Sequence, residues 1–439
     1  MGERTSVSLD QFGFVFCEFV DYAGVIRSRL VPRDRFADVR ERGVNFSKAI
    51  MSHNVVDAYP ADRMYSPADG DFWAVPDLPT LRPAPFHQGV GMALCDLVDE
   101  RGQPWPGCPR TALRAALAAA EAELGGRFLA AFEPEITLVD QAWRGPADAC
   151  GAFAPRGIER QWPFVERVLD GARRMGLEVV QVSKECAPGQ LEFNLAHKPL
   201  LEACDDLVAF RQLVKAAADA VGVIATMMPK PFPDRPGNGL HLHISLTDGS
   251  GNLFADPDDE FGLSQMAYSF LAGIIAHAPG LLGLAAPSVN SYKRLVPGHW
   301  APTWACYGPG NRSALIRIPE KRRGTRIEYR GGDASANPYL YALGVVVAGA
   351  AGVRDGLKPG PPVRHDVDGL SPAQLAERGS IRLPAHLGEA LNALNHDPVL
   401  TGALPRPLLV EYTRVRRSEW DAYLRAVTDW DVKTYGEVI

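Results

Sequence analysis

The sequence predicts an α+β protein of two unequal parts, and three observations support this prediction. The first hundred of its 439 residues alternate short β-type runs with turns. Residues 101–110, RGQPWPGCPR, are dense in proline and glycine, which interrupt regular structure. After them, patterns typical of helices and of strands mix. We therefore expect an N-terminal domain over 1–104 and a larger domain over 105–439.

The N-terminal domain is expected to begin with a β-hairpin. Its strands are GFVFCEFVD (13–21) and VIRSRLVP (25–32), and the intervening Tyr-Ala-Gly is a turn signal. Two further β-type runs follow, FWAVPDLPTLRPAPF (72–86) and GMALCDLVD (91–99). These runs predict a small sheet.

The larger domain is expected to alternate amphipathic helices with strands. The predicted helices cover 111–124, 157–176 and 198–222, and the predicted strands cover 128–139, 177–185, 190–195 and 240–246. The longest apolar run, YALGVVVAGAAGV (341–353), follows the capping residues Ser335 and Asn337. It is shorter than the ~20 residues that cross a bilayer, so we expect a buried helix and no membrane association.

Composition narrows the class of protein. The net charge of −6 and the sequence pI near 6.0 argue against general binding to nucleic acid or to an anionic membrane. The seven cysteines are scattered without a CxxC pair, which favours a reducing cytosol. The N-terminus lacks the basic-then-apolar pattern of a signal peptide. We therefore expect a cytoplasmic location.

Four expected strands carry chemically active side chains on one face, because residues two apart in a strand point the same way. These sets are Glu133 with Glu135; Gln190 with Glu192 and Asn194; His241 with His243; and Arg326 with Glu328 and Arg330. Glu185 ends a further strand. A solvated strand face explains any one set, but such faces usually mix Lys, Thr, Ser and Gln. Carboxylates, imidazoles and guanidiniums together are the groups that bind divalent cations and phosphates.

These faces favour a Mg²⁺-dependent enzyme that uses ATP and an acidic substrate. The Gly-rich GPGNRS (308–313) has neither P-loop nor GxGxxG spacing, so the nucleotide must be held another way. The basic run KRRGTR (321–326) is, by itself, equally typical of a solvated patch or a nucleic-acid contact. Beside RIEYR, in an acidic protein, it favours phosphate binding.

Taken together and in order, the motifs resemble the glutamine synthetase family, of the bacterial class I type. The pieces that carry the resemblance are FEPEITLVD, ECAPGQLEFN, TMMPKPF, GNGLHLHISL, NSYKRLVPG, NRSALIRIP and RIEYRGGDASANPYLYAL. The resemblance implies an N-terminal β-grasp-like domain and a catalytic domain with a curved antiparallel sheet that lines a funnel. It also implies a homo-oligomer, commonly a dodecamer of two hexameric rings, with active sites between subunits.

The resemblance also implies roles for individual residues. Ligands of a first metal are Glu135, Glu185 and Glu192, and ligands of a second are Glu133, His241 and Glu328. L-glutamate would contact Gly237, His241, Arg294 and Arg330, while Arg312, Arg317 and Arg294 would act in catalysis. ATP would contact His243, Ser245, Arg323, Arg326 and His197, although a surface position explains His197 equally well. The cofactors implied are two to three Mg²⁺ or Mn²⁺ ions per site, with ATP as a substrate.

The sequence departs from the family where ammonia would bind. Ammonia-using members typically continue VPGYEAP, whereas this chain has VPGHWAP, so Trp300 replaces a glutamate. In the looser match GVNFSKA (43–49), Ser47 replaces an aspartate that a neighbouring subunit contributes. Ammonium needs negative charge nearby, and one carboxylate at ~4 Å is worth up to ~4 kcal/mol at a dielectric of ~20. An indole instead offers an apolar π surface. The sequence therefore predicts a glutamate–amine ligase that forms a γ-glutamylamide from a small organic amine.

Three alternatives stay open at this point. An ordinary ammonia-dependent glutamine synthetase could draw its acceptor carboxylate from Asp57, Asp62, Asp69 or Asp71. A catalytically silent homologue is disfavoured because all six candidate metal ligands are present. A changed acid substrate is the third, because Pro236 stands where the family has an asparagine before Gly237.

Overall fold

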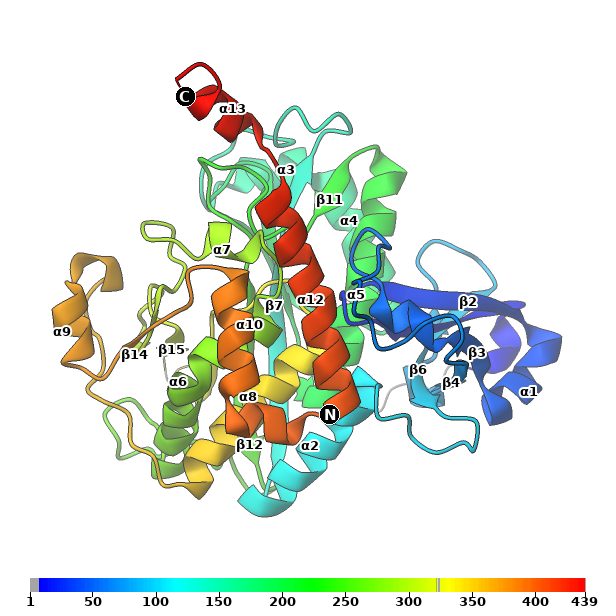
Figure 1. Cartoon of the computed structure of the whole chain (residues 1–439), viewed down its shortest axis with the longest axis horizontal. Helices are drawn as coiled ribbons and strands as arrows, with labels where there is room; N and C mark the ends of the chain where they lie inside the picture. Colours follow the sequence, from blue (N-terminus) through cyan, green and yellow to red (C-terminus); the bar gives the residue numbers. More distant parts are fainter. Residues whose placement is uncertain (1–7, 321, 323, 439) are drawn as a thin grey trace.

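The computed structural model describes residues 8–320, 322 and 324–438. Two sheets dominate it, and Figure 1 shows the N-terminal sheet to one side of a larger body of strands and helices. The expected α+β class is confirmed. The exact boundary at 104/105 stays a prediction: Trp105 stacks on Phe72 of the N-terminal sheet, with ring centroids 4.9 Å apart.

Among the described residues, six strands form the N-terminal sheet, in the order β2-β1-β6-β4-β3 with β5 on β6. The bounds are β1 Phe14–Val20, β2 Ile26–Pro32, β3 Val44–Ser47, β4 Asp71–Pro76, β5 Arg82–Pro83 and β6 Val90–Val98, with helix α1 at Arg33–Arg42. The predicted hairpin is present as β1 and β2, and β1 also pairs in parallel with β6. This central parallel pair is the arrangement expected of a β-grasp-like sheet.

Two expectations for this region were wrong. The single run 72–86 is broken into β4, the 3-10 helix η3 at Leu78–Thr80, and β5. Prolines at 76, 79 and 83 cause the break, because proline lacks the N–H that a strand donates. Helix α1 was not anticipated, because only Phe36 of its ten residues is buried, which leaves almost no apolar periodicity to detect.

Nine described strands form the catalytic-domain sheet, in the order β14-β15-β16-β12-β7-β9-β8, with β10 and β11 also on β7. Their bounds are β7 Arg127–Val139, β8 Val179–Lys184, β9 Gln190–Leu195, β10 Lys198–Pro199, β11 Ile224–Thr226, β12 Leu240–Thr247, β14 Tyr307–Pro309, β15 Ile316–Ile318 and β16 Ile327–Tyr329. The pairing is antiparallel as expected, except that β14 and β15 are parallel. A separate short pair joins β13 Trp304–Ala305 to β17 Ile381–Arg382.

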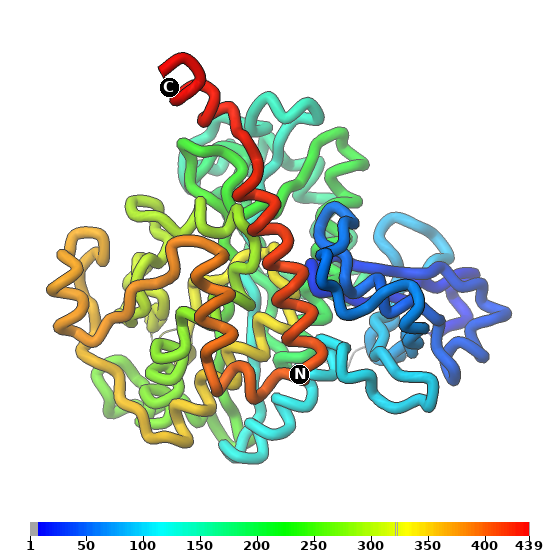
Figure 2. Tube along the Cα trace, viewed as in Figure 1, coloured from blue at the N-terminus to red at the C-terminus, as the bar shows by residue number. Residues whose placement is uncertain are grey.

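Helices α2 and α5 pack against β7 on the side away from the polar residues of the sheet, and the other helices surround them or lie at the edges. Their bounds are α2 Pro109–Leu124, α3 Pro155–Arg160, α4 Trp162–Met175, α5 Leu200–Val221, α6 Gln265–Ala285, α7 Ser291–Arg294, α8 Pro338–Arg354, α9 Pro372–Ala376, α10 Leu387–His396, α11 Pro398–Ala403, α12 Arg406–Arg425 and α13 Asp429–Tyr435. The helix predicted over 157–176 is divided into α3 and α4, because Pro163 starts a new helix. Figure 2 shows the chain after α12 projecting from the body.

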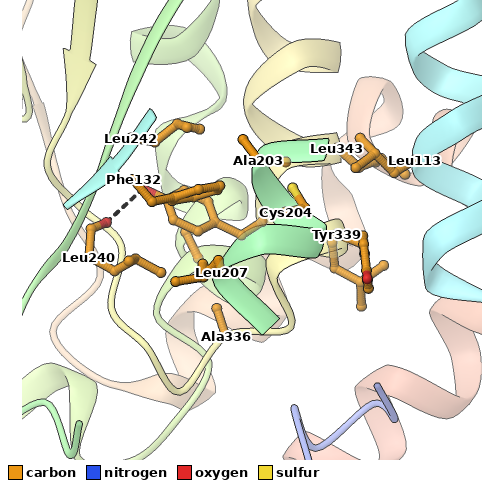
Figure 3. Close-up of a cluster of buried hydrophobic side chains, with 14 of the residues drawn as sticks. Leu113, Phe132, Ala203, Cys204, Leu207, Leu240, Leu242, Ala336, Tyr339 and Leu343 are labelled. Carbon is orange, nitrogen blue, oxygen red and sulfur yellow. Dashed lines mark hydrogen bonds between the residues drawn. The ribbon is translucent and has the colours of Figure 1, made fainter. Parts of the chain in front are cut away.

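The core explains which face of the sheet is left for chemistry. Phe132 of β7 and Leu242 of β12 pack with Leu207 of α5 and Leu343 of α8 in the cluster drawn in Figure 3. Successive strand residues point to opposite faces. Burying Phe132 and Leu242 against the helices therefore turns their neighbours, Glu133 and His241, to the other face.

One described helix, α6, is long and apolar enough to cross a membrane, but 72% of its most apolar window is buried inside the protein. It packs along α8, the helix predicted from the run 341–353. Helix α6 was not expected from the sequence, because Ser269 and His277 interrupt its apolar run.

Candidate active site

Strand register brings the predicted side chains together. His241 of β12 lies opposite Glu133 of β7, and His243 lies opposite Glu328 of β16. On the other edge of β7, Glu135 lies opposite Glu192 of β9. Four neighbouring strands thus carry these six side chains to one area of the polar face.

Two groups of side chains in this area have the geometry to hold a metal ion. One is Glu133, His241 and Glu328, and the other is Glu135, Glu192 and His241, with ligand atoms within 4.8 Å of one another in each group. The first group has the membership expected for the second metal. In the other group His241 stands where Glu185 was expected. His241 is buried, and its Nδ1 lies 3.6 Å from oxygens of both Glu133 and Glu328.

The pKa values of Glu192 and Glu185 indicate a site that favours a bound cation. Burial, with the carboxylate of Glu133 as the strongest neighbour, raises the pKa of Glu192 to about 10. Burial, and then Glu135, raises the pKa of Glu185 to about 7, so Glu185 lies near this cluster although outside both groups. This repulsion between buried carboxylates is relieved by a bound divalent cation. The oxygen and imidazole donors suit Mg²⁺ or Mn²⁺.

Glu133 and Glu328 are already compensated by positive charge. Burial opposes ionisation of Glu328, but Arg330 and the histidines outweigh it and hold its pKa at about 2. Burial is likewise outweighed at Glu133, where His243 and His241 hold the pKa below its ordinary value. These two carboxylates are therefore ionised and ready to act as ligands.

Side chains that were not assigned a role hold the cluster in place. Gln190 donates to Glu135 Oε2 at 3.1 Å, and Asn194 donates to Glu133 Oε1 at 2.7 Å. The buried Lys184 donates from Nζ to the carbonyls of Glu185, at 2.8 Å, and Ala187, at 2.6 Å, and so fixes the turn that carries Glu185. A lysine within a β-type run gives no local signal of this role.

Two of the candidate arginines, Arg330 and Arg317, bind the carboxylate of Glu328. Arg330 donates to Glu328 Oε1 at 2.5 Å, to the carbonyl of Arg312 at 3.0 Å and to the carbonyl of Trp300 at 3.3 Å. Arg317 donates to the other oxygen of Glu328 at 2.6 Å. The three bonds of Arg330 use three of its five N–H groups, which leaves two for a carboxylate substrate. The Arg312 charge reaches Glu185, acting to lower its pKa.

The buried Arg294 lies against the backbone of Gly237. It donates to the carbonyls of Gly332 at 3.1 Å and Arg330 at 3.0 Å. A Cβ atom at Gly237 would lie 2.1 Å from the carbonyl oxygen of Pro229 and 3.0 Å from Arg294 Cγ. Only glycine fits there, which keeps the loop pressed against the arginine.

The predicted nucleotide residues lie along the same face. His243 accepts at Nδ1 from Arg326 Nε at 3.0 Å, and its Nε2 lies 3.0 Å from Glu133 Oε1. Ser245 is the next residue on this face of β12 and is half-buried. His197 is exposed in the turn between β9 and β10. Arg323 lies outside the described residues.

The two acceptor candidates do not meet within one chain. Trp300 is 55% exposed and follows α7, whereas Ser47 ends β3 in the N-terminal sheet. Figure 1 shows α7 and β3 on opposite sides of the molecule. Ser47 accepts a hydrogen bond from the amide of Ala49 at 3.4 Å and caps the 3-10 helix η2 at Lys48–Ser52.

Comparison with known proteins agrees with this geometry. The chain is 37% identical over 444 residues, 98% of this chain and 97% of the relative, to the glutamate–methylamine ligase of Methyloversatilis universalis. It is 33% identical over 436 residues, 96% of each chain, to the glutamine synthetase of Methanococcus maripaludis. It is also similar to a solved structure described as a GmaS/ADP complex, with a TM-score of 0.86, 33% identity and 97% of each chain covered. Residues 106–435 match the family described as "Glutamine synthetase, catalytic domain", and the chain belongs to that family.

Proposed function

We propose that this protein is an ATP-dependent glutamate–amine ligase that joins L-glutamate to a small organic amine as a γ-glutamylamide, with release of ADP and phosphate. The observation that carries the proposal is the position of Trp300. Its carbonyl accepts from Arg330, and Arg330 also binds Glu328 of the metal cluster. The backbone of Trp300 therefore adjoins the polar cluster, at the position where ammonia-using relatives are expected to place a carboxylate.

The first step is activation of glutamate as γ-glutamyl phosphate. Glu133, His241 and Glu328 would hold one cation, and Glu135 and Glu192, with Glu185 nearby, would hold another. Bound divalent cations neutralise phosphate oxygens and orient them for in-line transfer. Arg317 and Arg312 add positive charge for the transferred phosphoryl group, while Arg294 and Arg330 bind glutamate beside Gly237. His243, Ser245 and Arg326, with Arg323 and His197, would contact ATP.

In the second step the amine nitrogen attacks the γ-carbonyl carbon and phosphate leaves. The relative named glutamate–methylamine ligase supports a short alkylamine as the acceptor. Trp300 would contact the alkyl group, and Ser47 of a neighbouring subunit would complete the pocket. This requires a homo-oligomer, for which we propose two stacked hexameric rings, and we retain the cytoplasmic location as a prediction.

An ordinary glutamine synthetase is the second candidate, since other relatives carry that name. It needs a displaced acceptor carboxylate, and the four candidate aspartates already have partners in their own chain. Asp57 binds Arg27, Asp62 binds Arg414, Asp69 binds Ser66 and Asp71 binds Asn45. This disfavours the second candidate.

The test is phosphate release from ATP and glutamate with ammonia, methylamine, ethanolamine, a polyamine and an aromatic amine. We expect at least one organic amine to exceed ammonia by more than ~100-fold in kcat/KM, or ~2.7 kcal/mol. Faster turnover with ammonia than with every amine would establish an ordinary glutamine synthetase instead.

A further inference from the structure

Residues 363–369, which we name the strap, form a short segment between α8 and α9. Val363 and Val367 are each 1% exposed and pack with Cys306, Ala314 and Leu375 in a small hydrophobic cluster. This cluster is separate from the main core among the described residues. Figure 1 shows α9, which follows the strap, at the edge of the molecule beside β14 and β15. The strap is thus anchored from within, although much of it is exposed.

The strap is bound to both neighbours of Arg312. Asn311 donates from Nδ2 to the carbonyls of Val363 and His365, both at 2.9 Å. The hydroxyl of Ser313 accepts from the amide of Val367 at 2.9 Å. These bonds fix the strap to the turn that carries a proposed catalytic arginine.

The strap is also bound to the acceptor loop, residues 296–300. Asp368 accepts from the amide of Gly298 through Oδ2 at 2.6 Å. Gly298 has φ +82°, a conformation that glycine adopts readily. From the inner side, Arg330 donates to the carbonyls of both Trp300 and Arg312. The Arg312 turn and the acceptor loop are therefore joined twice, by Arg330 inside and by the strap outside.

We propose that Asp368 is a positioning residue for amine transfer, which acts by holding the acceptor loop closed over the activated glutamate. This rests on the proposed function. A carboxylate that accepts from a backbone amide makes a charge-assisted bond. The glycine at the other end of that bond leaves the loop little stiffness of its own. We call this bond between the Gly298 amide and the Asp368 carboxylate the latch. It sets how long Trp300 stays in place.

Loss of the latch would let water compete with the amine. Water would attack the γ-carbonyl carbon of γ-glutamyl phosphate, a C–O bond to water would form, and the bond to phosphate would break. The products are glutamate and phosphate; one proton of water passes to the leaving phosphate and the other to solvent. The measurable consequence is ATP turnover without amide formation.

The chain offers a matched control two residues away. Asp366 caps the same 3-10 helix, η5 at Val367–Gly369, by accepting from the amide of Asp368 at 3.2 Å. Both aspartates are exposed, and Asp366→Asn removes the same charge as Asp368→Asn. Of the two aspartates, only Asp368 has a described hydrogen bond to the acceptor loop.

We expect Asp368→Ala to raise the KM for the amine about tenfold, the effect of losing one charge-assisted hydrogen bond at an exposed position. The KM for ATP and glutamate should change by less than about twofold, while phosphate release without amine rises. Hydrogen exchange in a peptide covering 295–303 should quicken about tenfold, since Gly298 loses its acceptor. Asp368→Asn should lie between Asp368→Ala and wild type, and Asp366→Asn should match wild type.

An unchanged amine KM in Asp368→Ala, or equal changes for amine, ATP and glutamate, would overturn the proposal. So would an equal effect of Asp366→Asn. If wild type uses ammonia and no organic amine, the proposed function fails, but the latch is still tested with ammonia as the acceptor. In that case a selective rise in the ammonia KM supports the latch, and no rise removes it.

Discussion

At the scale of single residues, Trp300 combines a functional position with an unusual backbone. Its φ of +52° lies in the left-handed region, which a bulky residue rarely adopts. Its carbonyl accepts a hydrogen bond from Arg330, and the amide of Gly298, two residues earlier in the loop, donates to Asp368. The surrounding bonds therefore maintain a conformation that costs on the order of 1–3 kcal/mol.

The indole and the backbone of Trp300 can be separated by substitution. Asparagine tolerates the left-handed conformation better than alanine. If the indole binds the amine, Trp300→Asn and Trp300→Ala should both lower amine kcat/KM by at least about tenfold, and the loop should be more stable with asparagine than with alanine. Steady-state kinetics with the amine panel measure the first effect, and exchange of residues 295–303 measures the second. Wild-type amine kinetics in Trp300→Asn would remove the indole from the acceptor site.

Restoring charge at the same position should change the acceptor. Trp300→Glu places a carboxylate where ammonia-using relatives are expected to have one, so the ratio of ammonia to amine kcat/KM should rise by about tenfold or more. Trp300→Gln has similar size without the charge and serves as the control. Equal losses for ammonia and amine in both variants would show that Trp300 only packs the loop.

At the scale of elements, the polar face of the sheet brings together carboxyl groups that repel one another unless a cation is bound. Glu192 of β9 is the clearest case, because three neighbouring carboxylates and burial oppose its ionisation. Gln190 and Asn194 on the same strand hold the neighbouring ligands Glu135 and Glu133. Without a cation, the cluster should therefore lower the stability of the sheet.

Glu192→Gln tests this trade of stability for function. Without metal, the free energy of unfolding of the variant should exceed that of wild type by on the order of 1–3 kcal/mol, because a buried carboxyl group among like charges is removed. Its thermal midpoint should therefore be higher. Adding Mg²⁺ should raise the thermal midpoint of wild type more than that of the variant. ATP-dependent turnover should be lost in Glu192→Gln, and EDTA should abolish it in wild type. A metal-free midpoint at or below that of wild type would contradict this reading of the cluster.

The contact between β1 and α5 should make stability depend on pH. Burial raises the pKa of Glu18 from 4.5 to about 7, against the opposing hydrogen bond from Gln212. A raised folded-state pKa stabilises the protein fully below about pH 4.5, and that contribution is lost as pH rises toward 7. At pH 8 the free energy of unfolding of Glu18→Gln should therefore exceed that of wild type by on the order of 3 kcal/mol, and its thermal midpoint should be higher. Near pH 5 the two proteins should match. Glu41→Gln on the exposed face of α1 is the control, and a pH-independent difference would contradict the assignment.

Local sequence pattern predicted some features of these elements and not others. The period of two in β7, β9, β12 and β16 was enough to put the polar residues on one face. The order of those strands was not readable from local pattern, because β7 pairs with strands more than fifty residues away. The family resemblance implied one curved antiparallel sheet but no strand order, which the structure provides. Lys184 acts through backbone carbonyls of the adjacent turn, and Asp368 acts through a backbone amide of a distant loop. Neither leaves a periodic signal. The pattern was misleading in two places. One β-type run was expected over 72–86 although its prolines break the strand, and α6 was missed because its apolar run is interrupted.

At the scale of the whole molecule, the N-terminal sheet is fixed firmly to its own catalytic domain. Arg110 at the start of α2 binds Asp77 and Asp96 on one side and Asp205 of α5 on the other. Ser52 of the N-terminal sheet region binds the buried Glu411 of α12. These contacts hold the N-terminal sheet, with β3, apart from α7 of the same chain, as Figure 1 shows. If Ser47 contributes to an acceptor site, as we propose, it must do so in a second chain.

Complementation between two inactive variants tests that requirement. Glu328→Gln inactivates the metal cluster, and Ser47→Arg blocks the pocket that Ser47 is proposed to complete in a neighbour. If sites form between chains, a mixed oligomer contains some sites with an intact Ser47 from one chain and an intact Glu328 from the other. Random assembly of equal amounts should restore about a quarter of wild-type turnover. Co-expression with two affinity tags isolates the mixed species, and sedimentation confirms its size. Mixed oligomers with no more activity than either variant alone would place the whole site within one chain.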